Sequence, residues 1–237
     1  MPDKHLSSQY DAELGQLSGK LLEMGGLVEA QLARAIDLLG EYEPRLVNEI
    51  LANEKTLNAM EVSMDQAISN VIARRQPAAR DLRLLMSMSK STTNLERAGD
   101  EARKIAKKAR HIAEDGPAHA INIAEIRLAG ELASRMLYRA LNAFARLDAA
   151  GAAQVVRDDL AIDNEFRAFV RKLITYMMED ASSIAVGLDY LFIAKAIERI
   201  GDHATNIAEL AIFVAHGTDV RHISLEDLER EVSDPDA

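Results

Sequence analysis

Two short stretches of the chain carry paired carboxylates at helical spacing, and each pair has the chemistry of a metal ligand. The first pair is Glu96 and Asp100, and the second is Glu198 and Asp202. Residues four positions apart share one face of an α-helix, so each pair presents two carboxylates side by side. Hard cations such as Mg²⁺ and Mn²⁺ prefer oxygen ligands of this kind. The spacing therefore predicts two acidic helix faces that suit cations.

The two stretches are copies of one motif. The first, ERAGDEARKIAK, begins at Glu96, and the second, ERIGDHATNIAE, begins 102 residues later at Glu198. Each copy has a glycine, Gly99 or Gly201, immediately before its aspartate. Glycine inside a helix costs about 1 kcal/mol relative to alanine. Its presence at matched positions predicts that another part of the protein closely approaches the helix backbone there.

A second acidic row is predicted on the helix that precedes each copy. Asp159 and Asp163 are again four residues apart, and in the first half the corresponding row is Glu54, Asn58, Glu61 and Asp65. Both rows run beside the apolar seam of their helix, which favours a position near the neighbouring helix. Four carboxylates brought together raise one another's pKa or need a cation. The common alternative for any single pair is a solvated or salt-bridged helix face.

Long apolar periodicities predict the helices that position these groups. Apolar residues recur at spacings of three and four, turn signals are few, and nothing reads as a β-strand. The expected helices begin near residues 11, 44, 77, 123, 152 and 182, and the last ends near residue 216. Pro77 is expected in the first turn of the third helix, and 148–151 is expected to be a loop.

The pattern restarts in the middle of the chain, which predicts an internal repeat. We therefore expect an all-α protein with two tandem, similar three-helix bundles, 9–115 and 116–217, followed by a polar C-terminal tail, 218–237. Within the tail, Ser224 and Asp227 have the spacing of a capping pair, which predicts a short final helix.

Composition excludes several classes of function. The formal net charge of −10 argues against nucleic acid as a partner, because phosphate neutralisation needs a basic surface. There is no cysteine, which excludes disulfides and thiolate metal sites. No apolar run approaches the about 20 residues that span a bilayer, and the first residues lack the apolar core of a signal peptide. We therefore expect a cytoplasmic protein.

Several segments resemble the PhoU family, from about Gln9 to Glu229. They are MGGLVEAQL from Met24, ARRQPAARDLRL from Ala73, LERAGD from Leu95, YMMED from Tyr176, and ERIGDHATNIAE from Glu198. The resemblance implies two similar three-helix bundles in one chain, a homodimer, and a regulatory adaptor that represses the phosphate-starvation response. It also implies two partners, the ATPase subunit of the phosphate transporter and the sensor histidine kinase PhoR, through which alone the protein would reach the membrane.

The same resemblance implies metal sites, because paired Glu/Asp-x-x-x-Asp motifs bind metal clusters in some members of the family. Carried over by position, the second-half site consists of Asp159, Asp163, Glu198 and Asp202, and the first-half site of Glu54, Asn58, Glu96 and Asp100. Asn58 offers an amide oxygen without charge, so we expect the first site to be the weaker. The metal is left open among Mg, Mn, Fe and Zn.

Two other functions remain open from the residues alone, a metal-dependent phosphohydrolase or transferase that uses the paired carboxylates, and a purely structural helical assembly. The chain has no P-loop, dinucleotide fingerprint or Ser/His/Asp signature, so we expect no catalytic residues and favour the adaptor. Arg97 and Arg199 are expected to pair with neighbouring acids rather than contact phosphate, and His203 is expected to be a surface or interhelix group.

Overall fold

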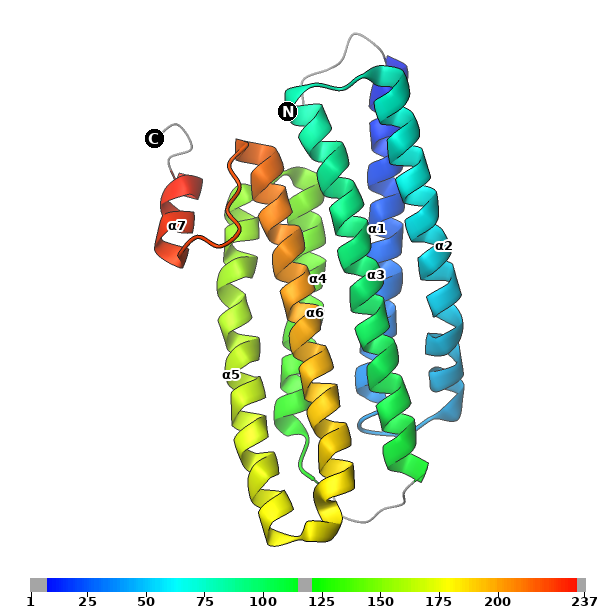
Figure 1. Ribbon diagram of the computed structural model, residues 1–237, viewed down its shortest axis with the longest axis vertical. Coiled ribbons are helices and arrows are strands. Elements are labelled where there is room, and N and C mark those ends of the chain that lie inside the picture. The colour runs from blue at the N-terminus through cyan, green and yellow to red at the C-terminus, as the bar shows by residue number, and fades with distance from the viewer. Residues whose placement is uncertain (1–7, 115–120, 234–237) are drawn as a thin grey trace.

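The computed structural model describes residues 8–114 and 121–233, which form two adjacent groups of three long helices (Figure 1). The first group comprises α1 (Ser8–Asp37), α2 (Pro44–Arg75) and α3 (Ala79–Glu114), and the second comprises α4 (Ala124–Arg146), α5 (Ala149–Glu179) and α6 (Ile184–His216). A 3₁₀ turn, Ala181–Ser183, precedes α6, and a short α7, Leu225–Ser233, follows it. The all-α class with two similar three-helix bundles is confirmed. The boundary expected between 115 and 116 lies outside the described residues.

The two groups share one apolar core. Helices α3 and α6 pack against each other at the centre of the molecule, and α1 packs against α4 behind them. At this second contact, side chains fill the space beside small residues: Leu141 lies over Gly25, and Ile36 lies over Gly130. The buried apolar residues form a single cluster that extends through both groups. Burial of a continuous apolar surface is the main source of stability, so the two bundles stabilise each other.

Two helix boundaries differ from the prediction, each for a local reason. Helix α5 begins within the expected loop because the Asp148 carboxylate caps it, accepting a hydrogen bond of 2.9 Å from the Gly151 backbone N–H. Pro77 is not in the first turn of α3. Gln76 adopts the left-handed conformation (φ 48°) that ends α2, and its N–H donates to the Ile72 carbonyl, so Pro77 falls between the two helices.

The short helix α7 folds back on α5. As predicted, the Ser224 hydroxyl caps it, accepting a hydrogen bond of 3.1 Å from the Asp227 N–H. Leu228 is buried, and Glu229 forms an ion pair of 3.0 Å with Arg157 of α5. None of the helices in the described part of the chain is long and apolar enough to cross a membrane.

Candidate metal sites

Helices α5 and α6 bring the four acidic residues predicted for the second half within electrostatic reach of one another. Burial raises the pKa of Asp159 to about 6, and the negative charges of Asp202, Asp163 and Glu198 add to the effect. Although solvent reaches Asp202, partial burial and the charge of Glu198 also raise the pKa of its carboxyl. The four carboxyl groups therefore act as one cluster.

Close packing against the motif glycines sets this arrangement, as the sequence predicted. A Cβ on Gly201 would lie 2.8 Å from the Ile162 side chain and 3.2 Å from an Asp159 carboxylate oxygen. A Cβ on Gly99 would lie 2.4 Å from the Leu57 side chain. Ile162 follows Asp159 by three residues, as Leu57 follows Glu54, so the two contacts are equivalent. The missing side chains let α2 and α5 place their acidic rows against α3 and α6.

Basic side chains already compensate part of the second cluster. Both Glu198 carboxylate oxygens accept hydrogen bonds of 2.6 Å from Lys195, and Asp163 pairs with Arg167 at 3.0 Å. Asp159 and Asp202 have no Lys or Arg nitrogen within 4 Å among the residues that the structure describes. A bound cation would therefore be stabilised most by the carboxylates of Asp159 and Asp202.

The first-half cluster is bridged by a guanidinium. Arg103, largely buried, places one terminal nitrogen 3.2 Å from Glu54 and the other 3.2 Å from Asp100. The equivalent residue in the second half is Thr205, which carries no charge and whose buried hydroxyl has no hydrogen-bond partner in the described structure. Asn58, the departure noted in the sequence, is exposed. The bridge by Arg103 gives a second reason, which the sequence did not reveal, for a weaker first site.

The acidic face of the first half extends along α2 past the four residues predicted to hold a metal, as the acidic row in the sequence indicates. Burial, and then the charges of Asp100 and Glu61, raise the pKa of Glu96. Glu61 accepts a hydrogen bond of 3.1 Å from Thr93, and Asp65 accepts one of 2.7 Å from Ser89. The spacing of Glu61 and Asp65 on α2 is the sequence signal for this extension.

No ready-made metal centre is present in the described part of the chain. Within residues 8–114 and 121–233, no three His, Asp or Glu side chains are arranged to hold one metal ion. A cation at the second cluster would therefore have to draw the Asp159 and Asp202 carboxylates inward. The donors still fit a hard cation, because they are carboxylate oxygens partly shielded from water. Burial and the neighbouring negative charges raise the pKa of both Asp159 and Asp202.

Ion pairs to two buried acids join the two halves at the α3–α6 seam, and only the pairing of Arg199 was expected from the sequence. Glu101, 5% exposed, pairs with Arg199 at 3.1 Å and with Lys104 at 2.8 Å. Asp189, 4% exposed, pairs with Lys108 at 2.7 Å and with His111. The partners of Asp189 lie about 80 positions away in the chain, so no local pattern could have linked them.

The predictions for the two motif arginines and for His203 have different outcomes. Arg199 pairs with an acid, as expected, but Arg97 has no carboxylate within 4 Å in the described part of the chain, so the pairing expected for it was wrong. His203 is an interhelix group, with its Nδ1 3.0 Å from the Asn94 side-chain oxygen. Burial lowers the pKa of His203 to about 4, so the ring is neutral and donates this hydrogen bond.

The fold and the repeated acidic helix pairs define a class of protein built from two copies of one three-helix unit. Residues 21–109 and 126–211 each match the family model described as the PhoU domain. The chain therefore belongs to the PhoU family.

Relatives and solved structures match over nearly the whole chain. A Burkholderia "Phosphate-specific transport system accessory protein PhoU homolog" is 53% identical, covering 98% of this chain and 99% of its own. The Escherichia coli (strain K12) "Phosphate-specific transport system accessory protein PhoU" is 38% identical, covering 99% and 97%. The crystal structure of PhoU from Pseudomonas aeruginosa matches with a TM-score of 0.85 and 42% identity, covering 88% of this chain and all of that one.

Proposed function

We propose that this protein is a regulatory accessory protein of phosphate uptake that represses the phosphate-starvation response through contacts with other proteins. The observation that carries the proposal is the end-to-end match to relatives named as accessory proteins of the phosphate-specific transport system. The partners are the transporter ATPase subunit and the sensor histidine kinase, and the protein is a peripheral, homodimeric component of their membrane complex.

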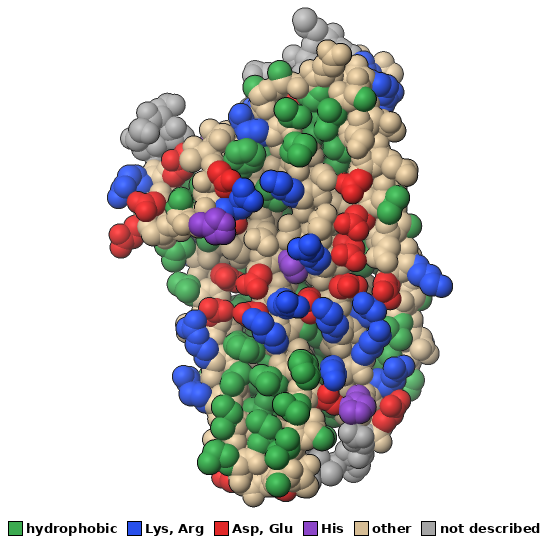
Figure 2. All heavy atoms as spheres, in the orientation of Figure 1, with side chains coloured by type: hydrophobic (Ala, Val, Ile, Leu, Met, Phe, Trp, Pro, Cys, Tyr) green, Lys and Arg blue, Asp and Glu red, His purple; other side chains and the backbone are tan. Residues whose placement is uncertain are grey.

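An exposed apolar patch supports action by contact. It lies where α5 ends and α6 begins, at the lower end of the face in Figure 2, below a row of Lys and Arg side chains. Its exposed residues are Ile174, Met178, Ile184, Leu188 and Phe192. Met178 is 81% exposed. A contiguous apolar surface rimmed by charge is typical of a protein interaction site, so we assign partner binding to this end of the second bundle.

A deletion strain tests the regulatory role. Without the gene, phosphate-starvation genes should stay switched on in phosphate-rich medium, and the cells should over-accumulate phosphate. The wild-type gene should restore repression, whereas Phe192→Glu should not. Tyr138→Glu, at an equally exposed aromatic residue on α4, is the matched control and should restore it. Normal repression in the deletion strain, or failure to co-purify with both the ATPase and the kinase, contradicts the proposal.

The second cluster supports metal binding as part of this function. Asp159 and Asp202 would hold Mg, Mn, Fe or Zn, with Asp163 and Glu198 beside them, and the ion would join α5 to α6 electrostatically. Isothermal titration calorimetry should show loss of one binding site in Asp159→Asn/Asp202→Asn. The matched first-half variant, Glu54→Gln/Asp100→Asn, should have the smaller effect. Equal stoichiometry in the wild type and the second-half variant contradicts the assignment.

The alternative, a metal-dependent phosphohydrolase or transferase, uses the same carboxylates and is tested directly. The purified protein, loaded with each metal in turn, is assayed for release of phosphate from a phosphoester. Turnover that disappears in Glu198→Ala would replace the adaptor with an enzyme. Equal background rates in both proteins favour the adaptor.

A further inference from the structure

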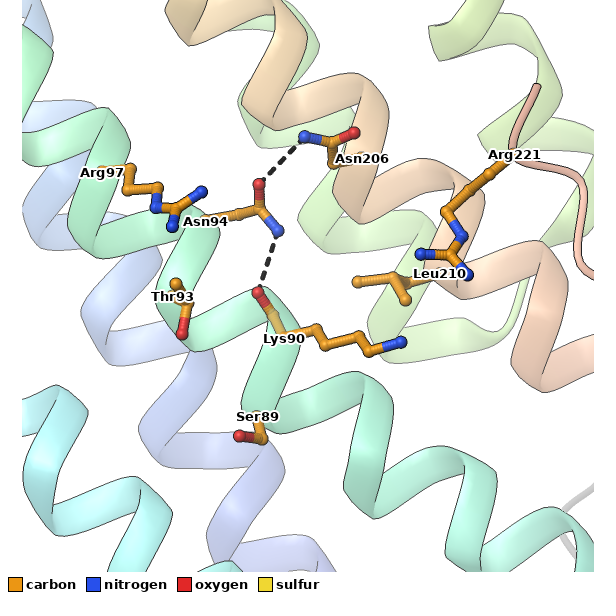
Figure 3. A pocket seen from close by; sticks show the side chains of 8 residues that line it. All are labelled: Ser89, Lys90, Thr93, Asn94, Arg97, Asn206, Leu210 and Arg221. Carbon is orange, nitrogen blue, oxygen red and sulfur yellow. Dashed lines mark hydrogen bonds between the residues drawn. The ribbon is translucent and has the colours of Figure 1, made fainter.

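A cavity of about 340 Å³ opens between α3 and α6, on the face shown in Figure 2, and no expectation from the sequence covers it. Helix α3 contributes two cations, two hydroxyls and an amide, α6 contributes an amide and one leucine, and the segment after α6 contributes an arginine (Figure 3). The lining residues are Ser89, Lys90, Thr93, Asn94, Arg97, Asn206, Leu210 and Arg221. Three of the eight are cationic and none is acidic.

Two of the three cations are free to bind a ligand. In the part of the chain that the structure describes, neither Lys90 nor Arg97 has a carboxylate within 4 Å. Arg221 is held by Asp219, at 2.5 Å between its terminal nitrogen and one carboxylate oxygen. This pair holds the pKa of Asp219 at about 2, so the aspartate stays charged. The pocket therefore combines three positive charges with one negative charge at its edge.

Amide groups give the floor of the pocket a fixed arrangement. The Asn94 side-chain oxygen accepts from Asn206 at 3.1 Å and from His203 at 3.0 Å, while its nitrogen donates to the Lys90 carbonyl at 2.9 Å (Figure 3). All polar atoms of this amide are thus engaged across α3 and α6. The hydroxyls of Ser89 and Thr93 donate to acids of α2 instead, so the cations and Asn206 remain as donors toward the cavity.

Glu209 on α6 interacts with Arg221 of this site and is only partly ionised at neutral pH. Burial raises the pKa of Glu209 to about 7, although the nearby Arg221 opposes the shift. The acids Glu61 and Asp65 on α2 already accept hydrogen bonds from pocket hydroxyls. Among the residues that line the cavity itself, the charged ones are Lys90, Arg97 and Arg221, and all three are positive.

We propose that this pocket binds phosphoryl oxyanions, as part of a small molecule that carries more than one phosphoryl group. Guanidinium groups match the paired oxygens of a phosphoryl group, and a lysine adds a point charge. The cavity is within the about 300–1,000 Å³ of small-molecule sites, so it has room for a chain of phosphoryl groups. Lys90 and Arg97 approach it from α3 and Arg221 from the segment after α6, so an anion in the cavity meets positive charge from two segments of the chain.

Calorimetry on the purified full-length protein, with a chelator present to exclude bridging metals, tests the proposal. Tripolyphosphate and ATP are the probes, with orthophosphate beside them. Tripolyphosphate should bind more tightly than orthophosphate. If ATP binds as tightly or more tightly, the source is a nucleotide; if it binds more weakly, the source is an inorganic polyphosphate. Failure of both polyphosphorylated probes to bind at millimolar concentration overturns the proposal and leaves the regulatory role untouched.

Variants separate this site from general electrostatic attraction. Arg97→Gln and Lys90→Gln, at exposed residues without ion pairs, should each weaken tripolyphosphate binding by about tenfold, as expected for one charge-assisted contact. Asp219→Asn removes the competing carboxylate, frees Arg221 and should tighten binding. Arg135→Gln on α4, which contributes nothing to the pocket, should leave binding unchanged. Equal affinities in the wild type, Arg97→Gln and Asp219→Asn would overturn the assignment.

Discussion

The two halves of the molecule carry the same acidic motif but neutralise it differently. In the first half, Arg103 lies between Glu54 and Asp100 and contacts both. In the second half, Thr205 stands in its place, and Asp159 keeps a pKa of about 6 among other carboxylates. One position in a repeated helix therefore decides whether a guanidinium bridges the two acidic rows.

What the halves keep in common is the packing, not the charge. The glycine contacts with Leu57 and Ile162 are buried, and a buried contact tolerates little change in volume. The carboxylates are partly exposed, so water screens a mismatch in charge. Duplicated helices can therefore diverge in what they bind while their spacing stays fixed.

The largest effect is expected from filling the shared glycine contact. Gly99→Val should lower the free energy of unfolding by about 3 kcal/mol, because its side chain would overlap Leu57 in the core. Gly201→Val should act in the same direction. Urea denaturation measures both. Gly26→Val is the matched control, since nothing lies within 4 Å of its Cβ position. Equal losses in all three proteins would mean that helix propensity, not close packing, sets the cost.

The next effect comes from exchanging the residues that distinguish the halves. Arg103→Met removes the bridge and should cost about 2 kcal/mol at pH 7, because two partly shielded carboxylates lose charge-assisted hydrogen bonds. Thr205→Arg should stabilise the metal-free protein and weaken metal binding at the second cluster. Denaturation and calorimetry check the pair. If Thr205→Arg leaves metal binding unchanged, position 205 does not control the second cluster.

A smaller effect, about 1 kcal/mol after screening by solvent, is expected from pH. The folded-state pKa of Asp159 lies above its unfolded value, so the folded protein binds the proton more tightly. Stability of the metal-free protein should therefore fall as pH rises from about 4 to about 6. Asp159→Asn should reduce this slope. Glu209, with a pKa of about 7, should also lower stability as pH rises, up to about pH 7. Comparing Glu209→Gln with Asp159→Asn therefore separates the contributions of the two carboxyls.

The smallest effect concerns how equivalent helices begin. Helix α5 starts with a side-chain cap from Asp148, whereas α2 starts at Glu43-Pro44 without one. Asp148→Ala should cost about 1 kcal/mol, and Glu43→Ser should add about 0.5 kcal/mol. Thermal unfolding resolves both. If Asp148→Ala and Glu43→Ala lower the free energy of unfolding equally, the cap at Asp148 does not contribute to stability.

The sequence predicted features that depend on local periodicity. Helix type and the close approach at Gly99 and Gly201 follow from spacings within one or two turns, and the repeat follows from two copies of one motif. The bridge by Arg103 was missed because it depends on which side chain reaches across two helices. The oxyanion pocket was missed because Arg97 and Arg221 are 124 positions apart, and Arg221 lies in a segment without a pattern. Asp148 was a readable cap that the loop prediction overlooked.

The length of α6 keeps the two proposed binding regions apart. The apolar patch extends along α6 to Phe192, and the cavity begins on the same helix at Asn206, 14 residues further. At about 1.5 Å per residue, this separates them by about 21 Å. A protein seated on the end of the second bundle therefore leaves the cavity open to solvent. We therefore expect that a protein partner on the patch and an anion in the cavity can bind at the same time without displacing each other.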